Sequence, residues 1–202
     1  MSELHNVLER ARQLGFFGPS EIEGQINHAL AFLPLLTSIR SETDSVSIVD
    51  LGAGGGLPSL PLLEAEPSLS ISMLDTSERR CSFLTWAISE LGFAQRAQVL
   101  HRRAEEFASE TENRETFDAV IARGFGPPAA TIESGAPLVR LGGLVVISEP
   151  PKQRNWPAEA LATVGLELAE TGQVVAFSKV AESPAEFPRS WKHIKAKPLF
   201  RI

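Results

Sequence analysis

The chain has 202 residues, is 43% hydrophobic and 22% charged, and carries a formal net charge of −6. These values are typical of one globular domain, and the acidic balance disfavours a large nucleic-acid footprint. The only cysteine, Cys81, excludes an intrachain disulfide and a thiolate zinc cluster, as suits a reducing cytoplasm. The charged N-terminal residues form no signal peptide, and no apolar run is long enough for a membrane helix. We therefore expect a cytoplasmic monomer with no membrane partner and no metal.

Residues 1–40 are predicted to form a helical N-terminal extension. Apolar residues recur at helical spacing over residues 4–14, and Gly15 can end that helix. Residues 20–23 (SEIE) have the form of a capping box, in which a hydroxyl and a carboxylate satisfy free backbone amides. A second helix is therefore predicted to start at Ser20.

Residues 41–202 are predicted to form the main domain, of the α/β class. Short apolar runs alternate there with amphipathic stretches, which is typical of β-α units around a parallel sheet. The predicted strands are 45–51, 70–75, 97–101, 117–122, 143–148, 165–170 and 173–180. Helices are predicted near 58–65, 77–91, 103–110 and 128–140. The last two strands flank a Thr-Gly break that indicates a hairpin, so a mostly parallel seven-stranded sheet with an antiparallel last strand is expected.

A glycine-rich loop follows the first predicted strand. Asp50 ends that strand, and Gly52, Gly54 and Gly56 follow in the form G-x-G-x-G. Glycine allows positive φ and close approach of a ligand, and open α/β sheets bind ligands at the carboxyl ends of their strands. The loop lacks the Lys-Ser or Lys-Thr pair of a phosphate-binding loop. It also fails the dinucleotide fingerprint G-x-G-x-x-G, because the sixth position is Leu57.

Two acidic residues flank the loop. Asp50 precedes it, and Asp75 ends the second predicted strand. A carboxylate at Asp75 can accept hydrogen bonds from both hydroxyls of a ribose, whereas Asp50 suits a cationic amino-acid group and repels pyrophosphate. These features favour S-adenosylmethionine, which has an ammonium, a sulfonium and a ribose but no phosphate. The closing hairpin agrees, because it is the arrangement of the Rossmann-like, seven-stranded class I methyltransferase. The alternative is that both acids are ordinary strand-end residues.

Four segments make the chain similar to a known family. They are VDLGAGGGLPSLPL (49–62), LDTSERRCSFL (74–84), HRRAEEF (101–107) and FDAVIARGF (117–125). They resemble the bacterial small-subunit ribosomal RNA guanine methyltransferase G family, RsmG or GidB. The last sixteen residues, with Phe-Pro-Arg and Lys-Pro-Leu, also resemble that family's ending. The resemblance implies an enzyme that uses S-adenosylmethionine to methylate the 7-position of a guanine in 16S ribosomal RNA.

The loop, its acids and the resemblance together supply the candidate site residues. Those expected to hold the cofactor are Asp50, Gly52, Ala53, Gly54, Gly56, Leu57, Asp75, Thr76, Arg80, Ala104, Glu105 and Arg123. Those expected to bind substrate are Phe125, Arg189, Lys192 and Lys197. Arg123, at the carboxyl end of a strand and at the mouth of the site, is the catalytic candidate. The resemblance also implies that Arg79, Arg80 and the basic tail would meet RNA. Because guanine N7 has a free lone pair, the reaction needs orientation rather than a general base.

The C-terminal segment leaves alternatives open. Residues 187–202 hold five basic residues and no acid, so they form either a solubilising tail or a contact for a polyanion. Within them, Trp191 either anchors the tail or stacks on nucleic acid, and Phe125 either stacks on a base or fills the core. Glu149 stands where the resembled family tends to have lysine, and it is expected to bring negative charge near the cofactor pocket. A small-molecule methyltransferase and a non-catalytic cofactor-binding paralogue are therefore alternatives to an RNA methyltransferase.

Overall fold

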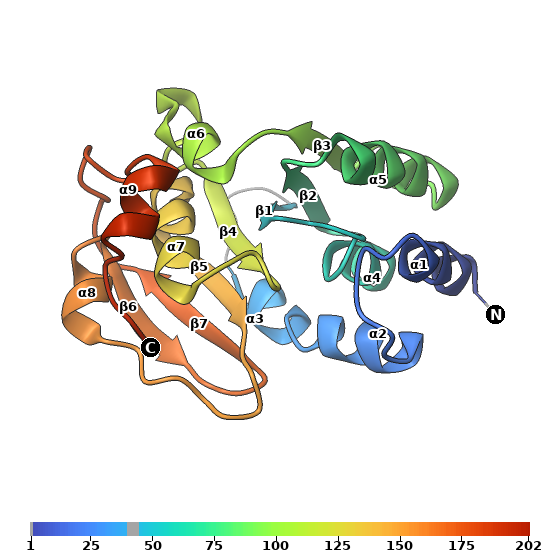
Figure 1. The fold of residues 1–202 in the computed structure, drawn as a ribbon, viewed down its shortest axis with the longest axis horizontal. Coiled ribbons are helices and arrows are strands. Elements are labelled where there is room, and N and C mark those ends of the chain that lie inside the picture. The colour runs from blue at the N-terminus through green and yellow to red at the C-terminus, as the bar shows by residue number, and fades with distance from the viewer. Residues whose placement is uncertain (1, 40–44) are drawn as a thin grey trace.

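A seven-stranded sheet forms the middle layer of the computed structural model, which describes residues 2–39 and 45–202 (Figure 1). The strands are β1 (Val46–Leu51), β2 (Leu69–Asp75), β3 (Ala97–His101), β4 (Phe117–Ala122), β5 (Val139–Ser148), β6 (Leu166–Glu170) and β7 (Val174–Lys179). Their order across the sheet is β3-β2-β1-β4-β5-β7-β6. The predicted boundary between extension and main domain, at residues 40 and 41, lies outside the described residues.

The pairing of the strands confirms the predicted α/β class. Strands β3, β2, β1, β4 and β5 are parallel, and β7 runs antiparallel to both β5 and β6. Strand order reverses between β1 and β4, which places the carboxyl end of β1 at the switch point where such sheets bind ligands. β5 starts four residues earlier than predicted, because Val139 already pairs with Phe117 before a register shift in β4.

Helices cover both faces of this sheet. They are α1 (Glu3–Gln13), α2 (Ile22–Leu30), α3 (Leu33–Thr37), α4 (Ser59–Ala65), α5 (Glu78–Glu90), α6 (Ala104–Ser109), α7 (Pro128–Gly135), α8 (Ala158–Ala162) and α9 (Trp191–Ala196). Short 3₁₀ turns occupy Thr111–Asn113 and Ala136–Leu138. Figure 1 shows α1, α2, α4 and α5 on one side of the strands and α6 to α9 on the other. No helix of the described residues is long and apolar enough to cross a membrane.

Each face of the sheet has its own apolar core. One core joins the N-terminal helices to the sheet and to α4 and α5, with Leu8, Phe32 and Leu62 fully buried in it. The other joins α6, α7 and α8 to the opposite face, around Ile132 and Phe177. The N-terminal helices therefore share a core with the residues that follow them, and they come to lie beside the glycine loop.

The predicted capping box of the second helix is wrong. α2 begins at Ile22 with Glu21 as its N-cap and without a side-chain cap, so Ser20 stands one position too early. Glu23 pairs instead with Nδ1 of His5 on α1, at 3.2 Å. The capping-box pattern fails because the helix begins at Ile22, whose side chain is 3% exposed and packs into the core.

Candidate functional site

The glycine loop connects the end of β1 to α4 through residues with positive φ. Gly52, Gly54 and Gly56 have φ of 69°, 58° and 91°. A Cβ on Gly52 would lie 3.0 Å from the Phe125 ring, and one on Gly56 would lie 2.4 Å from Leu60. Side chains are therefore excluded from both positions by backbone conformation and by neighbours, which keeps the loop backbone accessible.

Asp75 holds the loop from the end of β2. Its Oδ2 accepts a hydrogen bond from the N–H of Gly54 at 3.0 Å, and its Oδ1 accepts one from the N–H of Ser77 at 2.9 Å. The guanidinium of Arg80 lies 3.6 Å from Oδ2. Each carboxylate oxygen has a second lone pair, so Asp75 can fix the loop and still accept from a ligand's hydroxyls.

Asp50 lies beneath the loop and is fully buried. Its Oδ2 accepts a hydrogen bond from Oγ of Ser59 at 2.6 Å, whereas its Oδ1 has no partner among the described residues. Burial raises the pKa of Asp50 to about 7, and the negative charge of Asp75 adds to this rise. The hydrogen bond from Ser59 and the positive charge of Arg123 both lower the pKa and so oppose the rise. A buried acceptor without a partner costs free energy, so this oxygen favours a cation or donor arriving in the site.

Two adjoining hollows open at this edge of the sheet. One, of about 120 Å³, is lined by Gly52, Leu74, Asp75, Thr76, Arg80, Arg102, Ala104, Gly124 and Phe125. The other, of about 130 Å³, is lined by Phe16, Phe17, Gly52, Ala53, Gly54, Gly55, Leu57, Arg80, Arg123 and Gly124. Because Gly52, Arg80 and Gly124 line both, the hollows adjoin over the glycine loop, and we call the two together the loop groove.

Nine of the twelve cofactor candidates line the loop groove. They are Gly52, Ala53, Gly54, Leu57, Asp75, Thr76, Arg80, Ala104 and Arg123. The other three lie behind it: Asp50 is buried under the loop, Gly56 packs on α4, and Glu105 is 7% exposed on α6. Glu105 lies 3.8 Å from Arg103.

Arg123 lines one of the two hollows, from the position just after the carboxyl end of β4. Its guanidinium donates to the backbone oxygen of Gln25 at 3.5 Å and to the side-chain oxygen of the same residue. Burial lowers the pKa of Arg123, and the nearby Asp50 opposes that change. Asp118 forms an ion pair with Arg140 and Glu149 forms one with Arg154, so neither of these acids is paired with Arg123.

The substrate candidates fall into two groups. Phe125 lines the groove, and Lys192 and Lys197 are exposed on and just after α9. Arg189 differs, because its guanidinium forms two hydrogen bonds with the carboxylate of Glu133, at 2.7 and 2.6 Å. The guanidinium donors of Arg189 are therefore already engaged by a carboxylate of the same chain.

Glu149 lies outside the loop groove, and its charge is compensated. It is 6% exposed and accepts hydrogen bonds from Nη1 of Arg154 at 3.2 Å and Nε1 of Trp156 at 3.0 Å. A third hydrogen bond comes from the backbone N–H of Arg154, at 3.1 Å. The repulsion expected from an acid at this position is therefore cancelled by a cation five residues further along the chain.

Sequence reasoning missed Phe16, Phe17, Gly124, Arg102 and Gln25. The two phenylalanines follow α1 and reach the loop, where a Cβ on Gly55 would lie 2.8 Å from the Phe17 ring. Gly124 and Arg102 adjoin residues that were predicted, so proximity along the chain could have found them. Within residues 2–39 and 45–202, no three His, Cys, Asp or Glu side chains gather as a metal site would require.

Comparisons with solved structures identify the fold. A methyltransferase from Geobacter sulfurreducens superimposes with a TM-score of 0.62 over 90% of this chain and 91% of its own, at 14% identity. The [4+2]-cyclase SpnF superimposes with a TM-score of 0.52 over 69% of this chain and 57% of its own, at 18% identity. The fold is that of class I methyltransferases, and the cyclase shows that this fold alone does not fix the reaction.

Comparison of sequences defines the family. The family model for rRNA small subunit methyltransferase G (GidB) matches residues 4–179, so the chain belongs to this family. The ribosomal RNA small subunit methyltransferase G of Pelotomaculum thermopropionicum is 28% identical over 208 residues, covering 96% of this chain and 86% of that relative. The protein of the same name from Geobacillus kaustophilus is 33% identical over 161 residues, covering 71% and 66%. Methyltransferases of this family and fold in general use S-adenosylmethionine.

Proposed function

We propose that the chain binds S-adenosylmethionine in the loop groove and methylates the 7-position of a guanine in 16S ribosomal RNA. The observation that carries the cofactor assignment is the pair of carboxylates around the glycine loop. Asp75 has spare acceptor capacity, and Asp50 has a buried oxygen without a partner. A ligand with a ribose and an ammonium matches both, and the family membership supports ribosomal RNA as the substrate.

The residues of the groove would act by holding and orienting. Asp75 would accept from the ribose hydroxyls, and Asp50 would face the ammonium. Bound S-adenosylmethionine supplies an activated methyl group on a sulfonium. Phe16 and Phe17 line one part of the groove and would exclude water from it. Because guanine N7 has its own lone pair, alignment can supply most of the catalysis, roughly 7–11 kcal/mol in well-oriented reactions.

Arg123 is our candidate for the catalytic residue. Its guanidinium is held by Gln25 of α2, next to the loop and to Asp50. From that position it would bind an anionic group that enters the mouth of the groove, either the cofactor's carboxylate or a phosphate of RNA. A guanidinium suits both, since it presents planar paired donors.

Methyl transfer from labelled S-adenosylmethionine to 16S ribosomal RNA, free or in small subunits, tests the proposed function. We expect transfer to a guanine and a fall in RNA affinity as salt rises. The logarithm of the affinity falls linearly with the logarithm of the salt concentration, with a slope of about −0.7 for each phosphate contact to a single strand. Three such contacts, by Lys192, Lys195 and Lys197, would therefore contribute about −2 to this slope. Replacing all three by alanine should reduce the slope by that amount. Cofactor binding without transfer to any ribosomal RNA would refute the RNA assignment.

The pH dependence of cofactor affinity tests the role of Asp50. Folding stabilises its neutral form, so its contribution to stability is present at low pH and is lost as pH rises from about 4 through about 7. An ammonium favours the carboxylate, so affinity should rise about fivefold from pH 6 to pH 7, a range below the titration of the ligand's own amino group. Calorimetry should show this rise in the wild type and a flat profile in Asp50→Asn. An equal rise in both proteins would contradict the assignment.

A further inference from the structure

The C-terminal segment, residues 187–202, is attached to the body through an ion pair between the partly exposed Arg189 and the buried Glu133. Glu133 of α7 is fully buried, and the guanidinium of Arg189 binds both of its carboxylate oxygens. The backbone N–H of Arg189 also donates to Oε1 of Glu133, at 3.0 Å. Three hydrogen bonds to one buried carboxylate fix the chain at Arg189 and so determine where α9 begins, two residues later.

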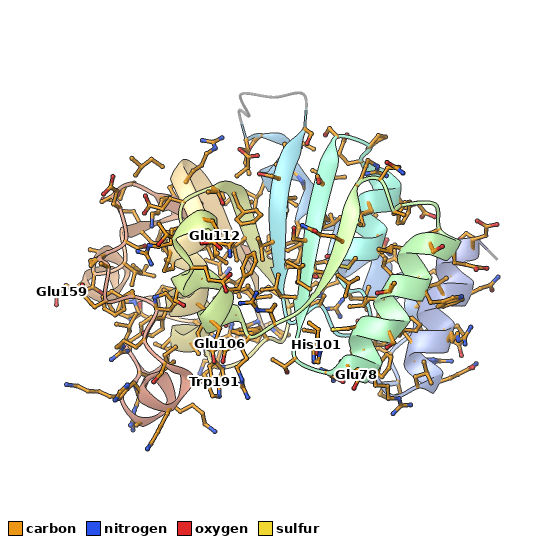
Figure 2. All side chains as sticks on the ribbon, turned by 90° about the horizontal axis from the view of Figure 1, so that it is seen from above. Glu78, His101, Glu106, Glu112, Glu159 and Trp191 are labelled. Atoms are coloured by element: carbon orange, nitrogen blue, oxygen red, sulfur yellow. The ribbon has the colours of Figure 1, made fainter. Side chains whose placement is uncertain are left out.

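Immediately after this anchor, Trp191 contacts Phe125, one of the residues that line the loop groove. Its ring lies edge-on to that of Phe125, with centroids 6.0 Å apart, and its outer edge is 3.7 Å from the position of a Cβ on Gly126. Phe125 in turn lines the groove and packs against Gly52. Figure 2 shows Trp191 at the same end of the strands as His101, which is the last residue of β3, so the ring lies at the carboxyl edge of the sheet.

Both aromatic rings are only partly covered, and positive charge lies next to them. Trp191 and Phe125 are half-buried, whereas Lys192, Lys195 and Lys197 are exposed. Among the described residues, none of these lysines forms an ion pair with an acid. A half-covered aromatic pair beside uncompensated cations has the chemistry of a surface that stacks bases and binds phosphates of single-stranded nucleic acid.

We propose that Trp191 stacks on a nucleobase of the RNA substrate at the mouth of the loop groove, with Phe125 as the second ring, and that the Glu133–Arg189 pair positions it there. The proposal rests on the proposed function, which supplies RNA as the substrate, and it assigns two new roles. Trp191 contacts substrate, and Arg189 is a positioning residue inside the chain instead of an RNA contact.

Fluorine NMR of protein labelled with 5-fluorotryptophan tests the stacking directly. The chain has three tryptophans, and the Trp191→Phe variant identifies the resonance of Trp191. The probe is a single-stranded RNA hexanucleotide with one guanine, and its control has an abasic site in place of that guanine. We expect the Trp191 resonance alone to shift with the first RNA and to stay in place with the second. A Trp191 resonance unmoved by RNA that binds the protein would overturn the proposal.

Kinetics of methyl transfer supply the second test. Trp191→Ala should lower kcat/KM for RNA about 5- to 150-fold, the range found when a stacking aromatic is removed. Trp191→Phe should recover most of the loss, and the dissociation constant of S-adenosylmethionine should stay within about threefold in both variants. Trp86→Ala is the matched control, because this half-buried ring packs against Arg10 and Phe83 and does not line the loop groove, so kcat/KM for RNA should not change. Unchanged kcat/KM in Trp191→Ala would refute the stacking role.

The anchor is tested by Glu133→Gln, whose amide is expected to weaken the bonds to Arg189. This variant should lower kcat/KM for RNA in the same direction as Trp191→Ala, and the Trp191 resonance should broaden. A sharp, unshifted resonance in Glu133→Gln would refute the positioning role. If the wild type transfers no methyl group to ribosomal RNA, the proposed function fails, and the shift of Trp191 with RNA still decides the stacking.

Discussion

Replacing Asp75 by alanine should weaken S-adenosylmethionine binding by about 100-fold or more. Two hydrogen bonds from a ribose to a carboxylate are together worth about 3 kcal/mol or more, which corresponds to that factor. The same substitution removes the acceptors for the N–H groups of Gly54 and Ser77, so the glycine loop keeps only its backbone bond from the N–H of Ala53 to the oxygen of Leu74 as a hydrogen bond to the end of β2. Isothermal titration calorimetry measures the loss.

A control must separate lost binding from lost stability. Ser77→Ala removes the N-cap of α5, where Oγ of Ser77 accepts from the N–H of Arg80, and this should cost about 1 kcal/mol of stability. Ser77 does not line the loop groove, so its variant should bind the cofactor about as tightly as the wild type. Undiminished affinity in Asp75→Ala would show that the ribose lies elsewhere. Equal losses in both variants would show that stability alone accounts for the effect.

The sequence predicts those site residues whose positions follow from a short stretch of chain. Asp50, the glycines and Asp75 each end or follow a strand, and parallel pairing of β1 with β2 then brings their ends together. The spacing of apolar runs similarly predicts the order of elements, because burial on both faces requires continuous apolar strands.

The parts that could not be predicted depend on contacts between distant residues. Arg123 binds Gln25, 98 residues away, and Arg189 binds Glu133, 56 residues away. No local pattern distinguishes Glu133, which is fully buried, from a solvated helical acid. Arg189 therefore looks like one more cation of a basic tail until the packing of that tail on α7 is known.

Replacing Glu115 by alanine should destabilise the fold by about 3 kcal/mol, because it leaves a buried cation without its counterion. Lys179, at the end of β7, is 1% exposed, and its ammonium lies 3.2 Å from the carboxylate of Glu115. It also donates to the backbone oxygen of Ala136 at 2.8 Å and to the hydroxyl of Ser183. Burial lowers the pKa of Lys179, and Glu115 opposes that change. Glu115 additionally accepts from the N–H of Ser183 at 2.8 Å.

The double variant distinguishes an uncompensated charge from simple loss of contacts. Lys179→Met keeps a long apolar chain in the same space and removes the buried charge, so combining it with Glu115→Ala should restore part of the stability that Glu115→Ala loses. Unfolding in urea, followed for both single variants and the double variant, gives the coupling energy. Losses that simply add would show that the ion pair contributes nothing of its own. Because Ser183 leads into the segment that carries Arg189 and α9, Glu115→Ala should also loosen Trp191 and lower RNA methylation at temperatures where the chain remains folded.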